Sequence, residues 1–282
     1  MIENRPGLNL LAHLVLILGV AMVALPVWVA FVASTHTATD FMSGRVPLWP
    51  GPHLVENYSA MLGAGLSTSG TPPIAPMMLN SLIMALTIAL GKIAISIISA
   101  FAIVYFRFRF RMLAFWLIFI TLMLPVEVRI VPTFKVVADL RLLNSYAGLS
   151  IPLIASATAT FLFRQTFLTV PDELAEAARI DGAGPMRFFW DILLPLSRTS
   201  IAALFVIQFI YGWNQYLWPL LITTDARYYT IVAGIKRMAD AVDGLPQWHL
   251  VMATAVMAML PPVLVVVGMQ KLFVRGLTET EK

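Results

Sequence analysis

The chain has 282 residues, of which 59% are hydrophobic and only 12% are charged. A soluble domain carries about 25% charged residues, so this composition excludes an ordinary water-soluble enzyme and indicates a protein that crosses a membrane several times. The net charge of +4 is small and spread along the chain, which argues against a nucleic-acid partner. The absence of cysteine excludes disulfides, thiol catalysis and cysteine metal sites.

The apolar stretches predict an all-α polytopic membrane protein with about six transmembrane helices. A helix that crosses the hydrocarbon core needs about 20 mostly apolar residues. The predicted spans are Leu10–Ala33, Leu79–Phe106, Met112–Val131, Leu149–Phe167, Ile201–Ile222 and Leu250–Phe273. The first exceeds the apolar part of a cleavable signal, about 7–15 residues, so we interpret it as a retained anchor. Asn80 and Ser81 are expected to cap the start of the second span.

Positive charges orient these spans. Arg107, Arg109 and Arg111 stand without an acid in the short link between spans two and three. Lys and Arg accumulate on the cytoplasmic side of membrane proteins, so this link is predicted to be cytoplasmic. With an even number of spans, both chain termini are then cytoplasmic as well. Residues 34–78, rich in Pro and Gly, become an ordered periplasmic loop with short helices, one of them starting near Leu54.

A polar stretch, residues 169–198, interrupts the apolar chain on the cytoplasmic side. Pro171 and the two acids after it favour a helix start, Gly182 can end that helix with a positive φ angle, and Pro185 can begin a second helix. The second helix carries an apolar face and ends at Pro195. The pattern predicts a bent two-helix projection with an apolar tip and a charged rim. By spacing alone it fits either an interfacial amphipathic helix or a docking surface for another protein.

The residues of this stretch resemble the EAA loop of bacterial ATP-binding-cassette (ABC) importer permeases of the carbohydrate type. The residues that match the motif without a gap are Glu176, Ala177, Ala178, Gly182, Ile192, Leu194 and Pro195. Asp181 and Pro185 lie inside the same segment. Tyr211–Leu221 is similar to the fifth-span signature of the same family, and Phe119–Ile130 and Ser156–Gln165 extend the similarity.

The resemblance implies a single permease domain, 1–282, in a bacterial inner membrane, with residues 169–198 as a cytoplasmic coupling loop. All nine loop residues named above are then expected to couple the permease to an ATPase, with Glu176 pairing with a basic residue of that ATPase. The implied partners are a second homologous permease subunit, two copies of the cytoplasmic ATPase, a periplasmic substrate-binding protein and membrane lipid. The implied mechanism is alternating access, in which ATP binding and hydrolysis switch the permease between two states.

No cofactor is expected on this chain, and ATP and Mg²⁺ are expected on the partner ATPase. Gly91-Lys92 lies in an apolar span with no glycine five residues before it, so it is not a phosphate-binding loop. The resemblance implies uptake of sn-glycerol 3-phosphate and of glycerophosphodiesters. A neutral sugar or oligosaccharide is the alternative substrate within the same family.

Polar and aromatic residues inside the spans are the candidates for the translocation path: Lys92, Glu127, Arg129, Trp213, Asn214, Gln215 and Trp218. A lysine at mid-membrane costs about 2.5–3.5 kcal/mol, so Lys92 either contacts an anionic substrate or is bonded to hydroxyl and carbonyl groups in helix packing. The two charged residues of span three form either a structural ion pair or part of an outer gate. The four residues of span five suit either polyol binding or hydrogen bonds between helices.

Three other classes of protein are alternatives to an importer permease: an enzyme, a scaffold and a secondary transporter. A membrane-embedded enzyme would need a nucleophile–base pair, an acid pair or a metal-ligand cluster where substrate meets water, and the spans carry none. The four histidines are scattered without ligand spacing, so no metal site is predicted. A non-transporting scaffold remains an alternative. A secondary transporter would be expected to show inverted repeats, and the sequence has no repeat.

Overall fold

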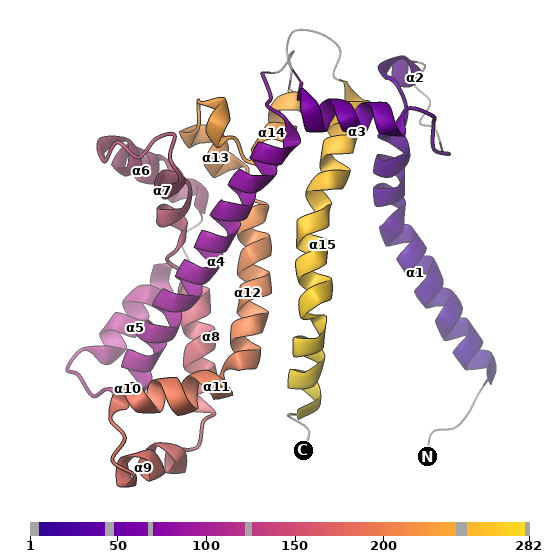
Figure 1. Ribbon diagram of the computed structural model, residues 1–282. Helices are drawn as coiled ribbons and strands as arrows, with labels where there is room; N and C mark the ends of the chain where they lie inside the picture. Colours follow the sequence, from indigo (N-terminus) through magenta and orange to yellow (C-terminus); the bar gives the residue numbers. More distant parts are fainter. Residues whose placement is uncertain (1–5, 43–47, 67–69, 122–125, 241–246, 280–282) are drawn as a thin grey trace. The chain divides into compact units, whose positions relative to one another are not determined.

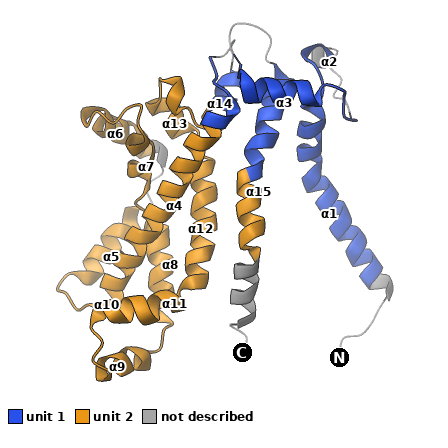
Figure 2. Ribbon diagram, viewed as in Figure 1, with its two compact units in different colours: residues 1–76, 234–260 blue, residues 77–233, 261–282 orange. Residues whose placement is uncertain are grey.

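The computed structural model describes residues 6–42, 48–66, 70–121, 126–240 and 247–279. Within these ranges the secondary structure is helical, apart from one isolated bridge between Leu66 and Thr71. The chain forms two compact units, residues 1–76 with 234–260 and residues 77–233 with 261–282 (Figure 2). Each unit combines two separate segments of the chain, so the division concerns packing, and the single permease domain stays a prediction.

The first unit holds α1 (Pro6–Ala33), α2 (Ala38–Met42) and α3 (Leu54–Gly63), together with parts of α4, α14 and α15. The helix predicted to start near Leu54 is therefore present. The loop that carries it is held to the end of α1 by Asn57, whose side-chain amide donates to the carbonyls of Ser34 (2.9 Å) and His36 (2.7 Å). Most apolar side chains of α1 are exposed, as expected for a helix that faces lipid or another subunit.

The second unit contains most of the remaining helices (Figure 1). In chain order they are α4 (Ile74–Tyr105), α5 (Arg111–Ile120), α6 (Val126–Asp139), α7 (Tyr146–Ser150), η3 (Ile151–Leu153), α8 (Ala157–Leu168), α9 (Asp172–Ile180), α10 (Pro185–Phe188), η4 (Phe189–Leu193), α11 (Leu194–Leu196), α12 (Arg198–Trp213), α13 (Leu217–Ile222), η5 (Ala226–Tyr228), α14 (Ile231–Ala239) and α15 (Trp248–Glu279). Helices α4, α14 and α15 contribute residues to both units.

The all-α polytopic fold is confirmed. By length and composition, three helical stretches can each cross a membrane, Asn9–Ala33, Ile74–Tyr105 and Trp248–Gln270, and they match the predicted first, second and sixth spans. Two bent pairs raise the number to as many as five: Tyr146–Leu153 with Ala157–Leu168, bent by 49°, and Pro185–Leu196 with Arg198–Trp213, bent by 72°. The predicted third and fifth spans are not single helices. Helix α5 has only 10 residues, and α12 and α13 are separate helices.

Hydroxyl side chains explain the break inside the predicted fourth span. Ser145 begins α7, and its oxygen accepts a hydrogen bond from the backbone N–H of Gly148 (3.0 Å). Ser156 begins α8 in the same way, accepting from Ala159 (3.3 Å). Each cap satisfies an N–H group that would otherwise lack a partner, so the apolar run forms two helices.

One expectation about α4 is wrong. The helix begins more than a turn before Asn80, so Asn80 and Ser81 do not cap its start. The Asn80 amide instead donates to the carbonyls of Arg227 (2.8 Å) and Tyr229 (2.9 Å), and its oxygen accepts from the Tyr146 hydroxyl (2.8 Å). These four residues form what we call the Asn80 latch. It ties one end of α4 to α7 and to the segment before α14.

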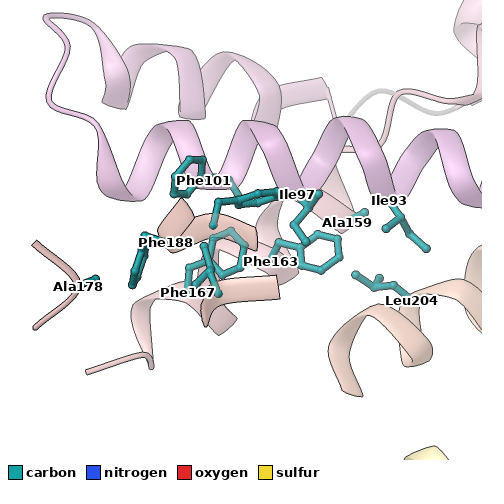
Figure 3. Packing of buried hydrophobic residues seen from close by; sticks show 12 residues of the cluster. Ile93, Ile97, Phe101, Ala159, Phe163, Phe167, Ala178, Phe188 and Leu204 are labelled. Atoms are coloured by element: carbon teal, nitrogen blue, oxygen red, sulfur yellow. The ribbon is translucent and has the colours of Figure 1, made fainter. Parts of the chain in front are cut away.

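At the other end of α4 lies a cluster of buried aromatic and aliphatic side chains. Side chains from α4, α8, α9, α10, η4 and α12 converge there (Figure 3). The ring of Phe101 packs on Phe189 with centroids 4.9 Å apart, and Tyr105 meets Phe188 edge-on at 5.2 Å. Such pairs contribute about 0.5–1.5 kcal/mol beyond the area they bury. The segment after α8 is therefore packed against α4 and α8.

Candidate functional site

The polar segment 169–198 folds into two successive helical arms (Figure 1). The first arm is α9, preceded by Pro171, with Asp172 and Glu173 in its first turn. Negative charge is favourable there because the helix dipole is positive at its N-terminus. The second arm begins at Pro185 and runs through α10, η4 and α11. We call residues 169–198 the coupling loop, after the function that the sequence implies.

Gly182 makes the corner between the two arms. Its φ angle is +76°, a conformation that glycine adopts without strain, as the sequence predicted. The backbone N–H of Gly182 donates to the carbonyl of Arg179 (3.0 Å), and that of Ala183 donates to Ala178 (2.8 Å). This pair of bonds is a Schellman motif, which satisfies carbonyls at the end of α9 and turns the chain sharply.

The second arm contains a π turn at η4, where the N–H of Leu194 bonds to the carbonyl of Phe189. A proline inside an α-helix clashes with the carbonyl four residues earlier, and here Pro195 would meet Asp191. The wider π turn relieves that clash. After Leu196 the chain bends by 72° into α12. Pro195 lies in the last turn of the second arm, which ends at Leu196, close to the predicted end.

The apolar face of the second arm packs inward, so exposed apolar residues of the projection come from other positions. Phe188, Phe189 and Leu193 are buried in the cluster of Figure 3, and so is Ala178 of the first arm. The exposed apolar side chains are different ones, with Ile180 86% exposed and Met186 and Trp190 also exposed. The motif residues divide accordingly. The exposed ones are Glu176, Ala177, Asp181, Gly182 and Pro185, and the half-buried ones are Ile192, Leu194 and Pro195.

Two of the predicted translocation-path residues, Lys92 and Arg129, line a cavity of about 670 Å³ in the same unit. Its wall comes from α4, α8, α12 and the chain between η3 and α8, together with residues of α5 and α6. Ligand cavities in proteins measure about 300–1,000 Å³, so this one has the size of a small-molecule site. Its polar lining side chains are Lys92, Ser99, Thr121, Arg129, Ser156, Thr158, Thr160, Gln208 and Tyr211.

Lys92 lies at the wall of this cavity and is only 6% exposed. Its ammonium donates a hydrogen bond to the side-chain oxygen of Gln208 (3.0 Å) and lies over the ring of Tyr211, 3.6 Å from the centroid. Both partners come from α12, one helical turn apart. One partner is the side-chain carbonyl of Gln208, a group of the kind expected for a packing role, and the other is an aromatic face; neither carries a charge.

Arg129 also lines a smaller cavity of about 320 Å³. Arg129, Tyr211 and two residues of η3 line both cavities. The smaller cavity is also lined by Asn214, Gln215 and the first two residues of α13, Leu217 and Trp218. Glu127 belongs to α6, but its side chain lies outside the described residues.

The four candidates of the predicted fifth span have different positions. Asn214 is exposed and Gln215 is half-buried, with its amide donating to the carbonyl of Tyr211 (3.2 Å). Trp213 is 2% exposed and stacks on Phe209, with centroids 5.9 Å apart. Trp218 lines the smaller cavity, yet it is buried and donates its indole N–H to the carbonyl of Gly148 (3.1 Å). The two tryptophans therefore act in packing.

Sequence reasoning missed Gln208 and did not connect Tyr211 with Lys92. A signal existed, because Gln208 is an amide within an otherwise apolar run, and polar residues in spans usually face a partner or a cavity. The sequence around Gln208 does not reveal that its partner is Lys92, 116 positions away. Among the described residues no group of three or more His, Asp or Glu is placed to hold a metal ion.

A family model for the "Binding-protein-dependent transport system inner membrane component" matches residues 92–279. The sn-glycerol-3-phosphate transport system permease protein UgpE of Agrobacterium fabrum is 60% identical over all of both chains. The proteins of the same name from Brucella melitensis and Yersinia pestis are each 59% identical over the same extent. A solved bacterial ABC transporter involved in the import of the acidic polysaccharide alginate has a chain with a TM-score of 0.80 at 20% identity, covering 96% of this chain and 98% of its own.

These matches show the class of protein: the chain is a multi-pass inner-membrane transport subunit and not an enzyme. The chain belongs to the family of binding-protein-dependent transport system inner membrane components. The resemblance read from the EAA loop is thereby confirmed at the level of the family. The alginate importer shows that the fold is shared.

Proposed function

We propose that this chain is one of two permease subunits of an ABC importer for sn-glycerol 3-phosphate. The observation that carries the proposal is the 60% identity, over the full length of both chains, with a permease named for that transport. Glycerophosphodiesters share the phosphate charge and are the next candidates. A neutral sugar or oligosaccharide is the alternative, and two cations at the cavity wall, Lys92 and Arg129, argue against it.

The proposed importer contains a second homologous permease, two copies of a cytoplasmic ATPase and a periplasmic substrate-binding protein. Dependence on a binding protein is part of the family description. ATP and Mg²⁺ would bind the ATPase, since this chain has no phosphate-binding loop. The arginine cluster between α4 and α5 supports a cytoplasmic position for both termini and for the coupling loop, with residues 34–78 on the periplasmic side.

The coupling loop is the proposed contact with the ATPase. Glu176 and Asp181 are exposed on the first arm, beside the exposed Ile180 and close in sequence to Met186. A surface of apolar anchors with acidic neighbours suits a groove that carries a basic residue. The remaining motif residues act differently: Gly182 sets the corner, and Ala178 fixes the loop to its own aromatic cluster.

The proposed translocation path runs along the two cavities, which share four lining residues. Lys92, Arg129, Asn214 and Gln215 line them, and Glu127 precedes Arg129 by two positions. In alternating access, closure of the ATPases would pull on the coupling loop and change the packing of α4, α8 and α12 around these cavities. The shared cluster of Figure 3 supports that connection, because it joins the loop to all three helices.

The proposal is tested with Glu176→Lys in the complete importer, reconstituted in proteoliposomes with its binding protein. Reversing this charge is expected to lower ATP-driven uptake of sn-glycerol 3-phosphate by roughly tenfold or more, since a charge pair at an interface center contributes about 1.5 kcal/mol or more. Glu173→Lys makes the same change one turn earlier on α9 and is expected to retain uptake.

Full uptake by the Glu176→Lys importer would refute the docking role. If the unaltered importer took up a neutral oligosaccharide and not sn-glycerol 3-phosphate, the substrate assignment would be wrong while the coupling assignment could still be measured. The two parts of the proposal therefore fail separately.

A further inference from the structure

The charge of Lys92 is not neutralised by the groups that hold it. Gln208 and Tyr211 offer an amide oxygen and an aromatic face, both uncharged. Among the described residues no carboxylate forms an ion pair with Lys92 or with Arg129. A buried lysine that serves only in packing is usually paired with an acid, because an isolated charge is costly in a low-dielectric environment.

The lysine also faces space rather than packed side chains on one side. It lines the 670 Å³ cavity, and no acidic side chain is among the described residues that line it. Hydroxyl groups stand around the same cavity, and Thr158 supplies one of them. Those of Ser99 and Thr160 donate to the carbonyls of Ile95 (2.7 Å) and Ser156 (3.0 Å), and they would have to rotate to donate to a bound anion. Hydroxyls and ammonium groups are the hydrogen-bond donors that a phosphate needs. The cavity therefore has the charge and the chemistry of an anion site.

The two partners from α12 are suited to hold the ammonium only until a stronger acceptor arrives. A hydrogen bond to a phosphate oxygen is charge-assisted, whereas that to the Gln208 oxygen has a neutral acceptor. The lysine has three N–H donors on a flexible stem, so it can keep its contact with the Tyr211 ring while it turns one donor toward the cavity. Arg129 reaches the same cavity and its smaller neighbour.

The geometry points to a phosphate station inside the membrane, formed by Lys92 with Gln208 and Tyr211 as its holders and Arg129 as the next cation along the path. This inference rests on the proposed function and deepens it: the permease itself, and not only the binding protein, reads the dianionic phosphate monoester. Lys92 contacts the phosphate, and Gln208 and Tyr211 are positioning residues that aim the ammonium into the cavity.

The test uses the complete importer in proteoliposomes, with uptake of sn-glycerol 3-phosphate and ATP hydrolysis stimulated by the loaded binding protein measured side by side. Lys92→Met is expected to lower uptake roughly 10- to 100-fold, the effect of losing one charge-assisted hydrogen bond. Stimulated ATP hydrolysis should persist, and Lys92→Arg should retain most uptake. Lys135→Met removes an exposed lysine of α6 and is the matched control.

A second substrate separates charge recognition from a general defect. Glycerophosphocholine carries a phosphodiester with one negative charge on the phosphate, so its uptake should fall less than that of sn-glycerol 3-phosphate in Lys92→Met. Equal loss of both substrates, or unchanged uptake of both, would overturn the station. If Lys92→Met and Lys92→Gln both failed to assemble while Lys92→Arg assembled, the lysine would be a packing residue and the inference would be overturned.

Failure of the proposed function gives a different experimental result from failure of the phosphate site alone. An unaltered importer that takes up no phosphate ester would overturn both the proposed substrate and the station. An unaltered importer that takes up sn-glycerol 3-phosphate, together with a Lys92→Met importer that does so equally well, would overturn the station alone.

Discussion

Gly182 gives the sharpest prediction, because its requirement is purely conformational. Its φ angle is +76°, and a Cβ atom built on it would meet no atom within 4 Å. A substitution to alanine therefore adds backbone strain without a clash. A Cβ in the left-handed region costs roughly 1–2 kcal/mol, and the stiffer unfolded chain of alanine returns about 0.4–1 kcal/mol. The net destabilisation of the corner is then about 1 kcal/mol.

That strain is released when the last turn of α9 opens. A change of about 1 kcal/mol should raise the equilibrium population of the open turn roughly fivefold. Hydrogen–deuterium exchange of peptides covering residues 176–186, in the permease complex, measures this directly. The amides of residues 182 and 183 should exchange about five times faster in Gly182→Ala, since their bonds to the carbonyls of Arg179 and Ala178 close that turn.

Gly184 provides the matched control. It lies two residues away with φ −72° and ψ 167°, and an added Cβ there also meets nothing within 4 Å. Gly184→Ala should leave exchange unchanged or slower, and Gly182→Asn should fall between wild type and Gly182→Ala, since asparagine tolerates the left-handed region. Equal exchange in Gly182→Ala and Gly184→Ala would show that the corner does not depend on a positive φ angle.

Three further substitutions test the packing of the second unit, each followed by the midpoint of thermal unfolding in detergent. Gly212→Ala should destabilise the protein by about 1–3 kcal/mol, because its Cβ would lie 2.9 Å from the Cα of Ala85. Gly268→Ala is the control, because its Cβ would meet open space, and it should leave the midpoint unchanged. Equal midpoints for the two variants would contradict the close approach of α4 and α12. Trp218→Phe should cost about 1–3 kcal/mol by leaving the Gly148 carbonyl without its donor, and an unchanged midpoint would place the indole outside the packing. Phe163→Ala, which removes a fully buried ring, should cost about 3–5 kcal/mol, well above the loss in the half-exposed Leu162→Ala.

Features encoded in single residues could be predicted from the sequence. The corner of the coupling loop depends on one glycine and on the proline that follows it, and both act on the backbone locally. Pro185 begins α10, as predicted, and Gly182 has the positive φ angle expected of it. The three long apolar helices were predicted for a similar reason, since about 20 apolar residues in a row are themselves the signal.

Features that depend on distant contacts could not be predicted. Hydropathy averages over a window, so it did not show that Ser156 starts a new helix inside the fourth span, or that the helix before it starts at Ser145, ahead of that span. The apolar face of the second arm was predicted, but not the surface that it packs on, which Phe101 and Phe163 supply from other helices. For Lys92 the sequence predicted burial, and only the structure shows the cavity that it faces.

The Asn80 latch has a mechanical consequence, since it shares a helix with the aromatic cluster. From Asn80 to Phe101, α4 is unbroken, about 32 Å of rod at 1.5 Å per residue. If the coupling loop tilted this rod by about 5°, the far end would sweep through about 3 Å. A hydrogen bond of 2.8 Å does not survive such a stretch. The segment before α14 must therefore either move together with α4 or lose its hydrogen bonds to Asn80. A movement that begins at the coupling loop would thus change the contacts of Asn80 at the opposite end of the same helix.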